Sequence, residues 1–152
     1  MKYLVLLPCN RYAIEGNYFK GRYWKIADKL RRNAKNDITL GAIDCIPVFY
    51  LNINDAIVLE NEMHIVKGYD SYPRYSKGKI KPLAEGIKNG LIRVANQFDR
   101  IIVLLNVKLY MEALQEAMKE LPESIKRKIE VRYVNGFPGK FIKMIKETIS
   151  SL

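Results

Sequence analysis

Two short runs of apolar and aromatic residues constrain the fold of this chain more than any other feature. They cover Tyr3–Leu7 and Ile101–Leu105, and neither alternates with polar residues as a strand with one wet face would. A strand that is apolar on both faces is typical of a parallel sheet covered by helices on both sides. The two runs therefore predict the central strands of an α/β fold.

Other segments have apolar residues at helical spacing. Helices are predicted from Tyr18 to Lys35, from Pro82 onward, over Tyr110–Leu121 and over Phe141–Leu152, and Ile129–Val134 predicts a further strand. The apolar stripe after Pro82 consists of Leu83, Ile87, Leu91, Val94 and Phe98. This alternation predicts a three-layer, mostly parallel sheet with helices on both faces, either Rossmann-like or uracil-DNA-glycosylase-like. No linker interrupts the pattern, so residues 1–152 are expected to form a single domain.

The stretch from Ile38 to Ile80 gives a weaker signal. Thr39–Ile46 predicts a second strand, but Pro47 argues against a long central one because proline cannot donate a hydrogen bond within a sheet. Gly68–Ile80 combines glycine, proline, serine and tyrosine, which predicts a loop. A loop of this length in a compact domain is often either functional or mobile.

The charge balance indicates a polyanionic partner. Basic side chains outnumber acidic ones by 26 to 16, for a net charge of +10. The excess is greater in residues 77–152, with 15 basic and 8 acidic groups, than in residues 1–76, with 11 and 8. A field of this sign attracts nucleic acids, although solubility alone also accounts for it. RNA or a nucleotide is the partner that we expect.

The remaining composition predicts a soluble, cytoplasmic protein without a membrane partner. No segment approaches the ~20 apolar residues that span a bilayer. Cys9 and Cys45 are expected to be buried thiols, unless a hyperthermophilic source allows them to form a disulfide. The abundance of isoleucine, lysine and tyrosine, with only two glutamines, is typical of an archaeal source.

Loops that follow the predicted strands contain the candidate ligand-binding residues. Parallel sheets bind ligands at the carboxyl ends of their strands. Asn10 and Arg11 follow the first strand, Asn106 and Lys108 follow Ile101–Leu105, and Lys140 follows the last strand. Together they predict a cationic edge suited to a phosphate or carboxylate, although Asn10 and Asn106 are equally well interpreted as caps. Neither a GxxxxGK[ST] nor a GxGxxG motif is present, and the sequence identifies no cofactor.

Asp70 is the leading candidate for a catalytic carboxylate. It lies in the predicted loop close to Tyr72, where aromatic neighbours suit a general base or a group that binds a nucleobase edge. A turn-forming aspartate is the alternative interpretation. His64 is the sole histidine, which excludes a multi-histidine metal site, and no metal ligand set is predicted.

The first predicted helix has a basic face that suits nucleic-acid binding. Its cations are Arg22, Lys25, Lys29 and Arg32. Tyr18, Tyr23 and Trp24 lie among them, and aromatic side chains provide stacking surfaces for unpaired bases. A solvated helix face is the alternative, and Tyr23 also belongs to the apolar stripe.

Several short motifs resemble the domain found in archaeosine synthase and related archaeal tRNA-guanine transglycosylase-like proteins. They are Leu6–Asn10, the pair Tyr69-Asp70 ahead of Gly78, Glu85, and Phe98–Val103. The bacterial peroxide-stress protein family is a weaker match. The resemblance covers about residues 4–121 and implies an α/β fold with a site around Cys9, Asn10, Asp70 and Glu85. Arg11–Glu15 departs from the family's Lys-Pro-Tyr pattern, so its amidotransfer chemistry does not carry over.

These observations lead to three functional hypotheses. The first is a nucleobase- or nucleotide-related protein linked to RNA modification or binding, with Cys9, Asn10 and Asp70 as catalytic residues. Arg11, Tyr72, Glu85, Asn106, Lys108 and Lys140 would then bind the ligand. The second is a non-enzymatic nucleic-acid-binding protein that uses the basic helix face. The third is a small-molecule enzyme outside nucleic-acid metabolism.

Overall fold

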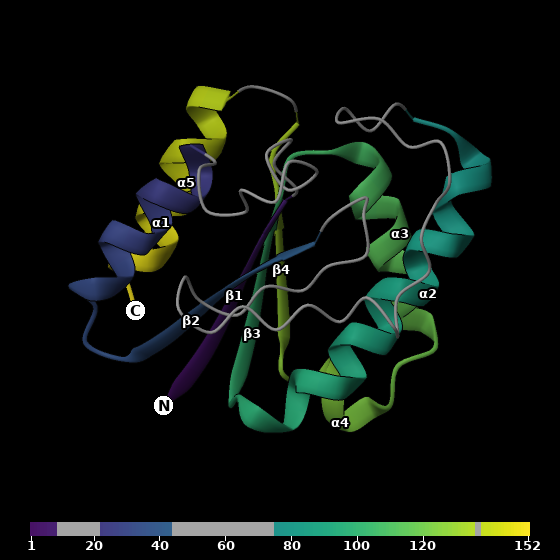
Figure 1. Ribbon diagram of the computed structural model, residues 1–152, viewed down its shortest axis with the longest axis horizontal. Helices are drawn as coiled ribbons and strands as arrows, with labels where there is room; N and C mark the ends of the chain where they lie inside the picture. Colours follow the sequence, from purple (N-terminus) through teal and green to yellow (C-terminus); the bar gives the residue numbers. More distant parts are fainter. Residues whose placement is uncertain (9–21, 44–74, 136–137) are drawn as a thin grey trace.

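The computed structural model describes residues 1–8, 22–43, 75–135 and 138–152 (Figure 1). Within them, four strands form one sheet in the order β2-β1-β3-β4, and every neighbouring pair is parallel. The strands are β1 (Lys2–Pro8), β2 (Asp37–Ile43), β3 (Arg100–Leu105) and β4 (Ile129–Tyr133). The two fully apolar runs are the adjacent central strands, as predicted.

Helices cover both faces of this sheet. They are α1 (Arg22–Arg32), α2 (Lys77–Val94), the 3-10 turn η2 (Ala95–Gln97), α3 (Lys108–Lys119), α4 (Glu123–Lys126) and α5 (Pro138–Ser150). Figure 1 shows α1 and α5 together on one side of the sheet, with α2 and α3 together on the other. The predicted three-layer α/β architecture is thus confirmed, and its all-parallel sheet is Rossmann-like.

Successive side chains of β1 point to opposite faces of the sheet, which divides the core into two halves. Leu4 and Leu6 pack with the apolar stripes of α2 and α3, whereas Val5 and Leu7 pack with α1 and α5. All four of these side chains are buried. Burial of an apolar side chain of this size contributes roughly 1.5–3 kcal/mol, so both halves of the core stabilise the central strand pair.

The predicted stripe of the second helix is confirmed, but the predicted start of that helix is wrong. Leu83, Ile87, Leu91, Val94 and Phe98 are all buried. The helix begins at Lys77, within the predicted loop, and therefore contains Pro82. Proline removes one i→i−4 hydrogen bond from a helix interior. Packing of Ile80 against the α2/α3 half of the core accounts for the extra turn, because a helical backbone brings this side chain onto that stripe.

Other boundaries also differ from the sequence-based expectation, among them the starts of β2 and α5. β2 begins at Asp37, ahead of the predicted Thr39, because its first residues extend the parallel ladder opposite Lys2 and Tyr3. The last helix begins at Pro138, whose fixed φ suits the first position of a helix. The predicted segment from Tyr18 to Gly21 lies outside the described residues.

We predict that Ile145→Ala lowers the free energy of unfolding by about 2–5 kcal/mol. Ile145 is 0% exposed between α5 and the sheet, so the truncation removes packing and leaves a cavity. Chemical denaturation monitored by circular dichroism measures the change. Ile92→Ala is the matched control, because Ile92 also lies on a helix but is 47% exposed. Equal losses in both variants would contradict the assignment of Ile145 to the core.

Candidate functional site

The carboxyl ends of the strands form the edge at which open parallel sheets bind ligands. In Figure 1, α1, α2, α3 and α5 begin at the upper end of the view, where β3 and β4 end. β2 lies on one side of β1 and β3 on the other, so the strand order reverses between β1 and β3. This switch point lies beyond Pro8 and Leu105, the last residues of the two strands. Topology therefore identifies a candidate crevice at this position.

Basic residues occupy the first turns of the helices that begin at this edge. As far as the structure describes them, α1, α2, α3 and α5 have no acidic residue in the first turn. The cations there are Arg22 and Lys25 in α1, Lys77 and Lys79 in α2, Lys108 in α3, and Lys140 in α5. A helix N-terminus carries a partial positive charge, so acidic residues stabilise it and basic residues oppose it. The edge is therefore cationic, at a cost in helix stability.

Asn106 connects the end of β3 to the helices on the α1/α5 face. Its Nδ2 donates to the Tyr23 hydroxyl at 3.3 Å. The Tyr23 ring in turn meets Phe141 of α5 edge-to-face, with ring centroids 4.7 Å apart. The N-cap of α3 is Val107, which makes no side-chain cap, so Asn106 does not cap this helix. The structure thus argues against capping of α3 by Asn106 and shows a contact with Tyr23 instead, while a ligand role for Asn106 stays a prediction.

The Asn106–Tyr23 pair has donors and acceptors to spare. No other hydrogen bond involves either side chain in the part of the chain that the structure describes. The Asn106 carbonyl oxygen can accept, while the second amide proton and the Tyr23 hydroxyl proton can donate. Both side chains are half-buried, so a ligand that reached them would be partly shielded from water. A nucleobase edge presents this mixture of groups.

Lys108 belongs to a second cluster, between the starts of α2 and α3. Its Nζ lies 4.6 Å from the centroid of the Tyr75 ring and 4.0 Å from Oε1 of Glu112. The Tyr75 hydroxyl donates to Oε2 of Glu112 at 2.6 Å. This hydrogen bond is the main reason that the pKa of Tyr75 is raised above its ordinary value. Tyr75 and Glu112 are thus the neighbours of Lys108 at the carboxyl edge.

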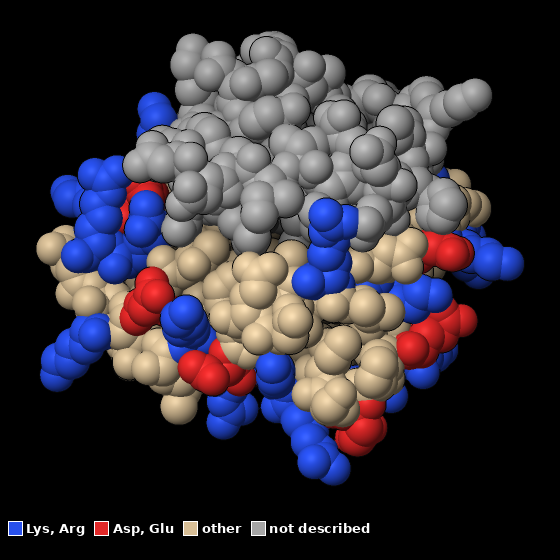
Figure 2. Space-filling view, turned by 60° about the horizontal axis from the view of Figure 1, so that its bottom comes forward, with Lys and Arg blue, Asp and Glu red and all other residues tan. Residues whose placement is uncertain are grey.

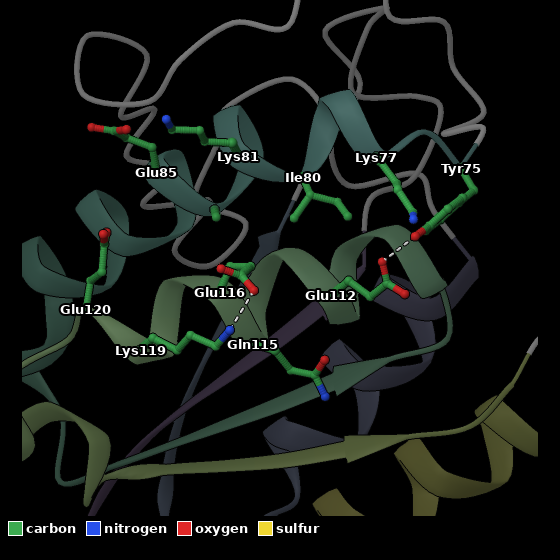
Figure 3. Close-up of a pocket in the computed structure, with 11 residues that line it drawn as sticks. Tyr75, Lys77, Ile80, Lys81, Glu85, Glu112, Gln115, Glu116, Lys119 and Glu120 are labelled. Carbon is green, nitrogen blue, oxygen red and sulfur yellow. Dashed lines mark hydrogen bonds and ion pairs between the residues drawn. The ribbon is translucent and has the colours of Figure 1, made fainter.

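A groove of about 700 Å³ runs between α2 and α3 (Figure 3). Its lining consists of Tyr75, Lys77, Ile80, Lys81, Ala84, Glu85, Glu112, Gln115, Glu116, Lys119 and Glu120. Charges of both signs alternate along it, and Lys119 is paired with Glu116 at 2.8 Å. Beside the groove, Lys88 is paired with Glu120 at 3.2 Å. Because acidic and basic groups offset one another, the groove does not select a ligand of either charge.

The predicted ligand residues divide among separate places. Asn106, Lys108 and Lys140 lie at the carboxyl edge, at or beside the beginnings of α3 and α5. Glu85 is exposed on α2 and lines the groove, which contains neither Asn106 nor Lys108. Glu85 and Asn106 thus lie in different parts of the described structure, and a shared ligand for them stays a prediction. Glu85 is on the exposed side of α2, away from the sheet.

Several candidate residues lie outside the described part of the chain. They are Cys9, Asn10, Arg11, Asp70, Tyr72, Cys45 and His64. The sequence does not predict that Tyr23 lies beside Asn106 or that Tyr75 lies beside Glu112. Its patterns assign Tyr23 to the first helix and Tyr75 to a loop, and the tertiary contacts to Asn106 and Glu112 place them at this edge.

The basic face of α1 is confirmed, but the interpretation of Trp24 as a stacking surface is wrong. Arg22, Lys25, Lys29 and Arg32 are all exposed. Trp24 is 4% exposed and packs in the core beneath α1, because the helical repeat places it on the apolar side. It offers no surface on which an unpaired base could stack.

Neither a cluster of metal ligands nor a membrane-spanning helix is found among the residues that the structure describes. Within the described ranges, no group of three or more histidine, cysteine, aspartate or glutamate side chains could hold a metal ion. Over those ranges, too, none of the helices has the length and apolar character needed to cross a membrane.

Comparisons with known proteins give little guidance on function. No family model matches the chain, and no curated protein matches it. Among solved structures, a de novo designed Rossmann fold protein is similar over 97% of each chain, with 15% identity and a TM-score of 0.46. This likeness is too low to support an argument, so the fold is assigned from the strand order itself. The resemblance to the archaeosine synthase domain stays a prediction.

We predict that Lys77→Glu raises the free energy of unfolding by about 0.3–1 kcal/mol. Lys77 is the first residue of α2, where an anion would interact favourably with the helix dipole. Lys29→Glu, in the last turn of α1, is the matched control because the same change of charge there opposes the dipole. Urea denaturation measures the free energy of unfolding of both variants. Equal shifts would mean that net charge, rather than position in the helix, determines the effect.

Proposed function

We propose that this chain binds a nucleotide, either free or as part of an RNA, at the carboxyl edge of its sheet. The observation that carries the proposal is the basic first turn shared by α1, α2, α3 and α5. Selection for stability alone favours acidic residues at these positions. Basic residues there are most simply explained by an anion that they bind.

The phosphate is expected to lie against the starts of α3 and α5. The first N–H groups of a helix have no intrahelical acceptor and point toward this edge. Lys108 and Lys140 add full charges beside them. Lys108 is held near this position by the ring of Tyr75 and the carboxylate of Glu112, which lowers the entropy that it loses on binding.

The base or ribose is expected to contact the Asn106–Tyr23 pair. Asparagine matches the adjacent donor and acceptor of an adenine edge, and the tyrosine hydroxyl provides a further donor. Both residues lie at the switch point, next to the end of β3. The site would therefore combine an anion-binding part, formed by helix N-termini, with a polar part that recognises the base.

The sequence resemblance supports the same class of ligand. The archaeosine synthase-like motifs imply a role in tRNA modification, and Cys9 and Asn10 directly follow Pro8, the last residue of β1. If the chain is an enzyme, Cys9, Asn10 and Asp70 are its predicted catalytic residues. The proposal of nucleotide binding stands on the described residues and does not require that role.

A second candidate function is nucleic-acid binding without catalysis. It is favoured by the exposed basic face of α1, on which Lys29 and Arg32 lie beyond the first turn at the carboxyl edge. The two functions make different predictions, because mononucleotide binding should depend on Asn106, whereas backbone binding should depend on the helix face.

We predict that Asn106→Ala weakens binding of adenosine monophosphate about tenfold, since the variant loses a hydrogen bond of about 1–1.5 kcal/mol. Tyr23→Phe should have a similar effect because it removes the hydroxyl while keeping the ring that contacts Phe141. Isothermal titration calorimetry measures the affinities, with inorganic phosphate as a second ligand whose binding neither variant should change.

Asn96→Ala is the control for this experiment. Asn96 is exposed in η2, which precedes β3 and therefore lies at the opposite edge of the sheet. This variant should bind the nucleotide like the unmodified chain. The proposal fails if Asn106→Ala and Asn96→Ala have equal effects, or if the unmodified chain binds neither nucleotide nor phosphate.

A further inference from the structure

We propose that α1 and α5 together form a surface that binds the phosphodiester backbone of double-stranded RNA. Its residues are Arg22, Lys25, Lys29 and Arg32 of α1 with Lys140, Lys143 and Lys146 of α5, and we call it the α1/α5 basic surface. All seven side chains are exposed. The inference does not depend on the nucleotide site, because most of these residues lie away from the carboxyl edge.

Packing between the two helices joins their basic residues into one surface. Trp24 and Ala27 of α1 pack in the same half of the core as Phe141, Ile145 and Ile149 of α5. Because these apolar sides face the sheet and one another, the basic sides face solvent. Figure 1 shows the helices side by side, and Figure 2 shows basic side chains gathered at the left of the molecule.

The acidic residues on these helices leave most of the positive charge available. Asp28 is buried and binds both Arg31, at 2.7 Å, and Arg32, at 2.8 Å. On α5, Glu147 lies 3.9 Å from Lys143, and both side chains are largely exposed, so this pair is worth little. Within the described residues, Lys25 and Lys29 have no acidic partner.

The α2/α3 layer has acidic residues among its lysines, so the α1/α5 basic surface does not follow from the overall composition of the chain alone. Glu112, Glu116 and Glu120 lie among the lysines of α2 and α3, and ion pairs neutralise Lys88 and Lys119. In α1 and α5 the acidic residues are the buried Asp28 and the exposed Glu147, so basic side chains outnumber acidic ones on this exposed surface.

The shape and chemistry of the surface favour double-stranded RNA. Exposed large hydrophobic side chains in the described residues are Met1, Tyr75, Ile92 and Tyr133, none of which is on α1 or α5. An anionic membrane would normally receive apolar side chains from such a helix, and unpaired bases would stack on aromatic ones. Exposed basic side chains without exposed large hydrophobic neighbours match the phosphodiester backbone of a nucleic acid.

The geometry favours RNA over DNA. Both helices lie flat on the sheet, so neither projects into the B-DNA major groove, which is about 12 Å wide. A-form RNA presents a wide, shallow minor groove flanked by phosphates, and proteins bind it mainly through shape and backbone contacts. The basic residues of α1 span about 15 Å along the helix axis, which suits several successive phosphates.

The test is a salt titration of binding to an RNA hairpin stem of about 16 base pairs, the span of known double-stranded RNA-binding domains. Each phosphate contact contributes about 0.9 to the slope of log K against log salt. Lys25→Glu with Lys29→Glu should therefore lower the slope by about 1.8 and the affinity at least about tenfold. Lys143→Glu with Lys146→Glu should also weaken binding, because α5 belongs to the same surface.

Lys119→Glu with Arg127→Glu is the control, since it makes the same change in net charge on exposed residues elsewhere. Equal losses of RNA affinity in the control and in the α1 variant would overturn the proposal. Binding to duplex DNA, or to vesicles containing phosphatidylserine, that is tighter than binding to the RNA stem would also overturn it. Lys25→Gln with Lys29→Gln repeats the test without charge reversal, and circular dichroism verifies folding. Unchanged binding of adenosine monophosphate in Lys143→Glu with Lys146→Glu, both beyond the first turn of α5, would separate this surface from the nucleotide site.

Discussion

The burial of β1 and β3 on both faces is the constraint on which the rest of the structure depends. Leu4–Leu7 and Ile101–Leu105 have no solvent-exposed side, so helices must cover the sheet above and below. Because these strands are parallel, the chain must return from the carboxyl end of one strand to the amino end of the next. The helices α1, α2, α3 and α5 therefore begin at the carboxyl edge, and their positive ends point the same way.

This arrangement gives the two proposed surfaces different physical characters. At the carboxyl edge, helix dipoles add to the charges of Lys77, Lys108 and Lys140, which favours a compact anion such as a phosphate group. Along α1 and α5, the charges are spread over exposed faces and screened by salt, which favours an extended polyanion. A protein with both features can bind an RNA through its backbone and one nucleotide through its edge.

Local patterns predicted the layers of the fold and the basic face of α1, because both depend on the spacing of residues within one element. The start of α2 was not predictable, since packing of Ile80 against the core outweighed the local signal of Pro82. The Asn106–Tyr23 contact joins residues 83 positions apart, so no local pattern indicates it. The position of Glu85 in the groove also depends on how α2 meets α3, which no local pattern indicates.

Backbone amide chemical shifts during titration with adenosine monophosphate test the central claim most directly. The account predicts that shifts concentrate at Tyr23, Asn106–Lys108 and Pro138–Lys140, which lie together at the carboxyl edge. Shifts confined to the outer faces of α1 and α5, or to Asn96 and Glu123–Lys126 at the opposite edge, would contradict it. The same titration with inorganic phosphate should move the first turns of α3 and α5 while leaving Tyr23 unchanged.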